Sequence, residues 1–218
     1  MKNRSILKKQ TTSRNLLSAC VIALTVAFTA LLPQLARAGN GNVTPPPVPA
    51  TIQVQAGNIA FLEGHAVGTQ NYICLPCAIS TTCPSGFAFA LFTPEATLFK
   101  DNDKQLITHF FSPNPFENGM IRATWQDSKD TSTVWGGRAI SSTDPDFVAP
   151  DAIPWLLLPE AGVQEGPTGG KTLTATTFIQ RLNTSGGVAP SVGCASSTDV
   201  GTKAFVPYTA DYFFYKAQ

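Results

Sequence analysis

Short runs of apolar, β-branched and aromatic residues recur along residues 51–218, and turn-forming residues separate them. Several runs alternate apolar with polar positions, which is the pattern of strands that bury one face. Gly68 interrupts one pair of runs and predicts a turn or bulge there. The runs that we interpret as strands lie at residues 51–55, 59–67, 70–75, 87–92, 105–111, 121–126, 132–140, 172–182 and 205–215. The pattern predicts about ten short strands.

Helical periodicity is nearly absent from the same region. No window of about eleven residues keeps an apolar stripe at helical spacing without an interrupting Pro or Gly. The polar tip 100–104 lies between apolar runs at 97–99 and 105–111, so it predicts a hairpin. The run 153–159 contains two prolines, which favour a strand over a helical turn. We therefore expect one all-β domain over 51–218, an antiparallel β-sandwich or barrel held by disulfides.

The first 38 residues have the layout of a secretory signal peptide, with a basic start, an apolar stretch and small residues at Ala36 and Ala38. We predict cleavage after Ala38 and a secreted or periplasmic location with no membrane segment left. Two alternatives are a lipobox ending at Cys20 and an uncleaved anchor at 16–32, which is short for a bilayer span. Residues 39–50 are rich in proline and predict a flexible leader without core residues.

Removal of that segment changes the charge of the chain. Six of the fifteen Lys and Arg residues lie in 1–38 and all fourteen Asp and Glu lie beyond it, so residues 39–218 carry 9 − 14 = −5. An acidic domain with few basic residues is wrong for nucleic-acid binding. The composition leaves the oligomeric state open.

Four cysteines follow the signal segment: Cys74, Cys77, Cys83 and Cys194. The Cys-x-x-Cys of Cys74 and Cys77 follows an apolar run and precedes a loop, whereas a redox pair starts a helix. A zinc site of thiolates is discouraged in an oxidising compartment, where structural disulfides are expected. Three pairings are possible and the spacing does not select one; our hypothesis joins Cys77 to Cys83 and Cys74 to Cys194.

The candidate ligand site is the loop around His109, Phe116 and Glu117, joined by Trp155. A Pro-rich bend separates His109 from Glu117 and would bring imidazole and carboxylate together. This loop is the candidate because loops on rigid β scaffolds carry most function. The expected ligand is a small molecule, a saccharide or an envelope component. A hydrolase that uses His109 with Glu117 or Asp151 is the alternative, and a purely structural envelope protein is the third interpretation.

Two further polar pairs are candidates for chemistry. Glu63 and His65 share one face of a strand, but two ligands do not define a metal site. We therefore predict no metal and no cofactor. Arg181 and Asp211 each lie within an apolar run, and such charges need a partner, which would be one another.

Several motifs resemble, in order, those of a family of secreted bacterial and fungal proteins that is catalogued only as a domain of unknown function. They lie at residues 67–74, 94–99, 151–158 (DAIPWLLL), 178–184 (FIQRLNT) and 206–215 (VPYTADYFFY). The resemblance covers about residues 48–216, implies a stand-alone exported domain and carries no catalytic residues. Family members have Gly-Pro-Thr-Trp-Glu after the His; here the step from His109 to Glu117 is one residue longer and Phe116 replaces the Trp.

Overall fold

The computed structural model describes residues 43–218, and these contain nine strands and three 3-10 helices. The predicted signal segment lies outside the described residues. Within the described part of the chain, no helix is long and apolar enough to cross a membrane. The helices are Ala50–Ile52, Pro115–Glu117 and Ser197–Asp199. The strands are β1 (Asn58–Pro76), β2 (Phe87–Phe99), β3 (Gln105–Asn114), β4 (Met120–Asp127), β5 (Thr133–Gly136), β6 (Ile140–Ser142), β7 (Trp155–Gln164), β8 (Phe178–Gly186) and β9 (Lys203–Ala217).

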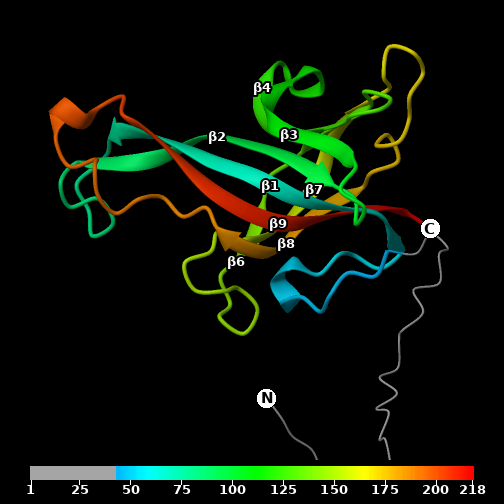
Figure 1. Ribbon diagram of the computed structural model, residues 1–218, viewed down its shortest axis with the longest axis horizontal. Coiled ribbons are helices and arrows are strands. Elements are labelled where there is room, and N and C mark those ends of the chain that lie inside the picture. The colour runs from blue at the N-terminus through cyan, green and yellow to red at the C-terminus, as the bar shows by residue number, and fades with distance from the viewer. Residues whose placement is uncertain (1–42) are drawn as a thin grey trace, which may run out of the picture. The chain divides into compact units, whose positions relative to one another are not determined.

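The strands form one antiparallel sheet that closes into a barrel (Figure 1). Their order is β5-β4-β3-β2-β1-β9-β8-β7-β6, and pairing of β5 with β7 closes an eight-stranded ring with β6 outside it. The prediction of an antiparallel all-β fold is confirmed, and of its two architectures the chain adopts the barrel. The predicted hairpin is the β2–β3 pair, in which Leu98 lies opposite Ile107.

Gly68 marks a close approach of two strands, and the expected turn or bulge at this position is wrong. It lies in the middle of β1, a single strand of 19 residues. A Cβ at this position would lie 2.1 Å from the carbonyl oxygen of Glu95 and 2.6 Å from the Cβ of Ala96. Glycine therefore lets β2 lie directly against β1 at this point, because any side chain would push the strands apart. The strands are accordingly longer and fewer than expected, and part of the expected strand 51–55 is 3-10 helix.

The barrel is filled by a core of large side chains. Alternate residues of each strand point inward, and Trp125 of β4 is 1% exposed at the centre of this inner core. Trp125 packs edge-on against Tyr212 and Phe214 of β9, with ring centroids 5.7 and 6.2 Å away. The other members include Leu98, Ile107, Val134, Leu158, Leu173, Ile179 and Tyr208.

A second core covers the outside of β7, β8 and β9. Phe213 and Tyr215 point outward between the inward Tyr212 and Phe214, and all four are at most 6% exposed. Strand β9 therefore buries aromatic side chains on both of its faces. The outer core also includes Ile52, and Val43 and Val48 pack against it. Residues 43–50 therefore contribute to the packing, which differs from the expected leader without core residues.

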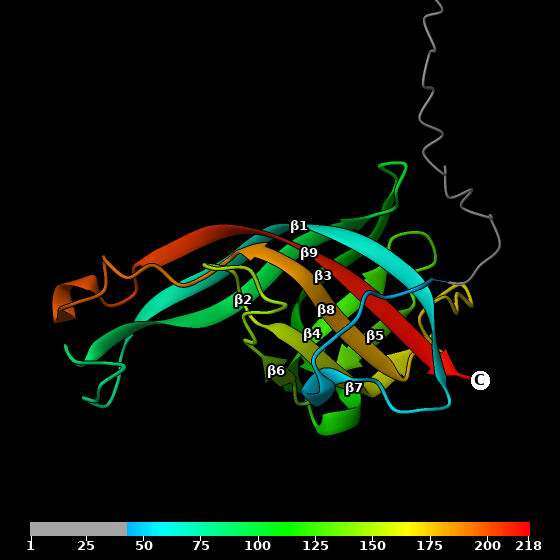
Figure 2. The same cartoon turned by 90° about the horizontal axis from the view of Figure 1, so that it is seen from below.

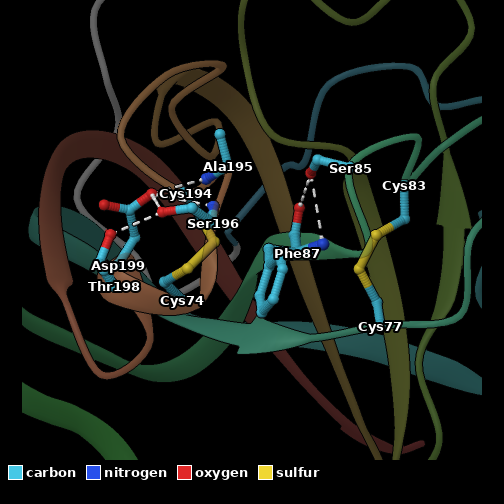
Figure 3. The surroundings of a disulfide bond; sticks show 10 residues. All are labelled: Cys74, Cys77, Cys83, Ser85, Phe87, Cys194, Ala195, Ser196, Thr198 and Asp199. Atoms are coloured by element: carbon cyan, nitrogen blue, oxygen red, sulfur yellow. Dashed lines mark hydrogen bonds between the residues drawn. A yellow bond between two sulfur atoms is a disulfide. The ribbon is translucent and has the colours of Figure 1, made fainter.

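Figure 2 shows a three-stranded arm that extends beyond the barrel, made of residues 72–76 of β1, 87–92 of β2 and 203–207 of β9. Two disulfides lie at its end (Figure 3). Cys74–Cys194 ties β1 to the loop before β9, and Cys77–Cys83 closes the loop between β1 and β2. The hypothesis for the pairing is confirmed. The disulfides hold the arm where the barrel core does not reach.

Candidate functional site

His109 of the predicted loop lies inside the barrel. The side chain comes from the inward face of β3, where it is 3% exposed and stacks on Trp125 with centroids 4.4 Å apart and an interplanar angle of 8°. Its Nδ1–H donates to the carbonyl of Thr124 at 2.9 Å. Burial lowers the pKa of His109 to about 3, against the raising effect of the Thr124 bond. The imidazole is therefore a neutral core group.

Phe116 and Glu117 lie in the 3-10 helix after β3, on the outside. Glu117 accepts hydrogen bonds from Arg122 Nε at 2.7 Å and Nη2 at 2.6 Å, and from Asn114 Nδ2 at 2.8 Å. The bond to Arg122 is the main cause that lowers the pKa of Glu117. Phe116 is 61% exposed and meets Trp135 edge-on. The carboxylate of Glu117 therefore pairs with Arg122, and the imidazole of His109 bonds the carbonyl of Thr124. The expectation that His109 and Glu117 come together is wrong.

Trp155 belongs to the outer core. It is 4% exposed and packs edge-on against Phe147 at 5.8 Å. His109 and Trp155 thus lie on opposite sides of the barrel wall, and the four candidate residues do not converge on one site. Asp151, the alternative partner of His109, is an exposed turn residue with φ 59°. Ligand contact at Phe116 and Glu117 stays a prediction.

The structure brings another set of polar groups together on the outer face of the barrel. His65 of β1 lies directly opposite Asp211 of β9, and Glu63 lies two residues earlier on the same face of β1. One ligand atom each from Glu63, His65 and Asp211 lies within 4.8 Å of the others. We call these three residues the β1–β9 cluster. Their side chains are partly exposed, so solutes have access to them.

Two more side chains fix the orientation of the β1–β9 cluster. His65 Nδ1 is 2.7 Å from Asp211 Oδ1, and His65 Nε2 is 2.9 Å from Oδ1 of Asp101, which lies in the β2–β3 turn. Asn183 of β8 donates to Asp211 Oδ2 at 2.8 Å. The imidazole therefore lies between two carboxylates. The bond to Asp211 is the main cause that raises the pKa of His65; burial opposes it and Asp101 adds to it.

The β1–β9 cluster has the donor types of a divalent-cation site. Zinc and similar ions take imidazole nitrogen and carboxylate oxygen at about 2.0–2.2 Å. A ligating histidine almost always donates its other ring N–H to a carboxylate, and ligating carboxylates are themselves hydrogen-bonded. Asp101 and Asn183 occupy these two outer positions around His65 and Asp211. Tetrahedral ligands at such distances lie about 3.3 Å apart. An ion would therefore need the 2.7 Å contact of His65 with Asp211 to widen and the carboxylate of Glu63, now within 4.8 Å, to take up the same spacing.

The sequence alone does not place Asp211 beside Glu63 and His65. It lies 146 residues from His65, and only the β1–β9 register places them opposite each other. The expected Arg181–Asp211 pair is wrong because Arg181 lies opposite Tyr212, one position away, and so points into the barrel. There Arg181 Nη2 donates to the carbonyl of Pro154 at 2.9 Å. In the sequence, the only indication that Asp211 has a special role is its place as an acidic residue within an apolar run.

Comparison with known proteins places the chain in a family. No curated protein and no solved structure matches the chain. Residues 55–216, essentially the whole barrel, match the family model described as protein of unknown function, DUF3455. This confirms the resemblance to a family catalogued only as a domain of unknown function. The chain belongs to the DUF3455 family.

Proposed function

We propose that this protein is an exported binding module that holds a divalent transition-metal ion, such as Zn²⁺, at the β1–β9 cluster. The single observation that carries the proposal is the convergence of Glu63, His65 and Asp211 within 4.8 Å. The outer carboxylate Asp101 and the amide of Asn183 support it, because each bonds a proposed ligand side chain in the way that is usual around metal ligands. The prediction of no metal assumed two ligands, and the fold supplies a third.

The protein scaffold suits a binding role. β1 and β9 pair along nearly their full length, from Asn58 opposite Ala217 to Ile73 opposite Lys203, so the cluster lies on the longest strand pair. The backbone on either side of His65 and Asp211 is fixed by this ladder and by packing of Ala66 and Tyr212 in the inner core. Sites built on strands hold their geometry better than sites on loops. The hydrolase alternative gains no support from the arrangement of His109, Glu117 and Asp151.

The test is a zinc titration of the untagged exported protein by isothermal calorimetry. We expect one Zn²⁺ per chain. Asp211→Asn and Glu63→Gln each remove a direct ligand, so each is expected to weaken binding by more than the roughly 10–100-fold that outer partners contribute. Asp101→Asn removes an outer partner and is expected to weaken binding by about tenfold, which is about 1.4 kcal/mol.

Glu165→Gln is the matched control. Glu165 is also an exposed carboxylate, but it pairs with Lys171 at 2.9 Å and lies outside the cluster, so zinc affinity should not change. Equal affinity in the native protein and Asp211→Asn would rule out the β1–β9 cluster as the zinc site. Absence of any saturable heat would reject the proposal as a whole.

Export is the second part of the proposal. The signal-like segment 1–38 and the two disulfides of the arm both suit an oxidising compartment outside the cytoplasm. We expect the exported chain to begin at Gly39 and to contain no free thiol. Intact mass before and after reduction measures both properties, and a chain that retains 1–38 would contradict the predicted cleavage.

A further inference from the structure

The arm leaves one edge of β2 without a neighbouring strand. β3 pairs with β2 only from Ala96 to Phe99, and then leaves to pair with β4. On the other side, β1 pairs with β2 down to Phe87. Within the described residues, therefore, no strand pairs with the outer edge of residues 87–93. Figure 2 shows this part of β2 lying beyond the barrel, at one side of the arm.

The hydrogen-bond alternation identifies the backbone groups that face this edge. Cys74 bonds towards the β9 side, through its N–H to the carbonyl of Thr202 and its carbonyl to the N–H of Gly201. Its neighbours Ile73 and Leu75 therefore bond towards β2, where they lie opposite Ala90 and Ala88. It follows from this alternation that the residues whose N–H and C=O groups face the open edge are Phe87, Phe89 and Leu91.

The regular part of this edge carries no charge and no proline that would keep it from pairing. Exposed sheet edges usually carry Lys or Pro, or an inward-pointing charge. Residues 71–94 contain no charged residue, and the segment Phe-Ala-Phe-Ala-Leu-Phe at 87–92 contains no Pro. Leu91 and Phe92 are 47% and 49% exposed. A bulge between β1 and β2 at Asn71/Tyr72 then limits the regular edge to residues 87–91.

We propose that two copies of this protein associate by antiparallel pairing of residues 87–91 of β2 about a twofold axis at Phe89. In this register Phe89 lies opposite Phe89 of the second copy, and Phe87 lies opposite Leu91 of the second copy. All three residues direct their backbone groups outward. In the described chain no strand bonds those of Phe89 and Leu91, whereas the N–H and C=O of Phe87 bond Ser85 Oγ at 3.3 and 2.9 Å and would exchange this hydroxyl for Leu91 of the second copy. The two arms then form one continuous sheet.

Self-complementarity is the reason to choose a second copy as the partner. A twofold axis places the same surface on both sides of an interface. Here the side chains that face each other are Phe89 with Phe89 and Phe87 with Leu91 on one face, and Ala88 with Ala90 on the other. Every cross-strand pair is apolar, and no like charges are opposed. The disulfides Cys77–Cys83 and Cys74–Cys194 hold the arm in one arrangement, which lowers the entropy lost on pairing.

Sedimentation velocity over a concentration series tests this dimer and its register. The native protein is expected to pass from monomer to dimer as concentration rises. Leu91→Glu disrupts both symmetric apolar pairs with Phe87 and is expected to raise the dimer dissociation constant by about tenfold. Adding Phe87→Lys places the introduced ammonium of one copy opposite the introduced carboxylate of the other in both pairs. The double variant is therefore expected to dimerise more tightly than Leu91→Glu alone.

Two further variants keep the test independent of folding. Phe205→Glu changes an aromatic of β9 that is 62% exposed and lies away from the β2 edge, so it should leave the dimer unchanged. Leu91→Pro removes an N–H that faces the edge and bonds no strand, so it should weaken the dimer without lowering the melting temperature of the monomer. A native protein that stays monomeric at every concentration would overturn the proposal. So would a double variant no tighter than Leu91→Glu, or weakening by Phe205→Glu equal to that by Leu91→Glu.

Discussion

Acidification from pH 6.5 to about pH 3 is expected to destabilise the barrel through His109. The unfolded residue has a pKa of 6.5, whereas burial lowers the pKa of the folded residue to about 3. Between these values the unfolded chain binds a proton that the folded chain does not, so stability falls as pH falls. The loss approaches about 1.4 kcal/mol per pH unit, or about 3 kcal/mol on acidification to two units below the unfolded pKa.

The measurement is the free energy of unfolding by urea across this pH range, with a chelator present. His109→Gln keeps an N–H donor for the carbonyl of Thr124 but does not titrate, so its stability should fall less steeply on acidification. His65→Gln is the matched control. The pKa of His65 is raised, so its protonation already favours the folded state at pH 6.5 and below, and this variant should keep the pH slope of the native protein. Parallel pH slopes for the native protein and His109→Gln would contradict the buried neutral imidazole.

Removal of the Cys74–Cys194 disulfide is expected to cost about 5 kcal/mol of stability. Its two cysteines are 120 residues apart, and closure of a loop of that length removes about that much free energy from the unfolded chain in the entropic account. The Cys77–Cys83 disulfide spans six positions, for which the same relation gives about 2 kcal/mol. The difference follows from loop length alone.

Two double variants compare the disulfides directly: Cys74→Ala with Cys194→Ala, and Cys77→Ala with Cys83→Ala. Guanidinium unfolding without reductant should show the larger loss for the first pair. The first pair also empties a fully buried position, since Cys74 is 0% exposed, which adds to the loss. A greater loss for the Cys77–Cys83 pair would show that the long loop is already compact in the unfolded chain.

Local pattern was sufficient to predict most strands of this fold but could not predict how the sheet closes. The alternation along residues 105–111 and the aromatic run of β9 identified their elements correctly. The choice between sandwich and barrel depended on pairing of β5 with β7, in which Val134 lies opposite Val163. No local signal encodes that partnership, because it depends on the twist accumulated across the whole sheet.

The same limit explains the site. The rarity of histidine in this chain draws attention to His109, yet that residue alternates with the core residue Ile107 and points inward with it. His65 and Glu63 form a visible pair because they are two residues apart. Asp211 joins them only through the register of β1 on β9, which a single residue of slippage would abolish. Proximity in the sequence therefore identifies Glu63 and His65 of this cluster but not Asp211.

Zinc binding and dimerisation are separable, because the β1–β9 cluster and the edge of β2 share no residue. Loss of zinc affinity in Asp211→Asn with an unchanged dimer would separate the two sites. His65 of the cluster lies opposite Phe99, at one end of β2. The free edge begins at Phe87, at the other end of that strand.

Anomalous X-ray scattering at the zinc absorption edge tests the metal site most directly. For crystals grown with equimolar Zn²⁺, we expect one strong peak among the side chains of Glu63, His65 and Asp211, with Asp101 against the other nitrogen of His65. A peak at any other place on the chain, or no peak among these three residues, would contradict the assignment of the β1–β9 cluster as a cation site.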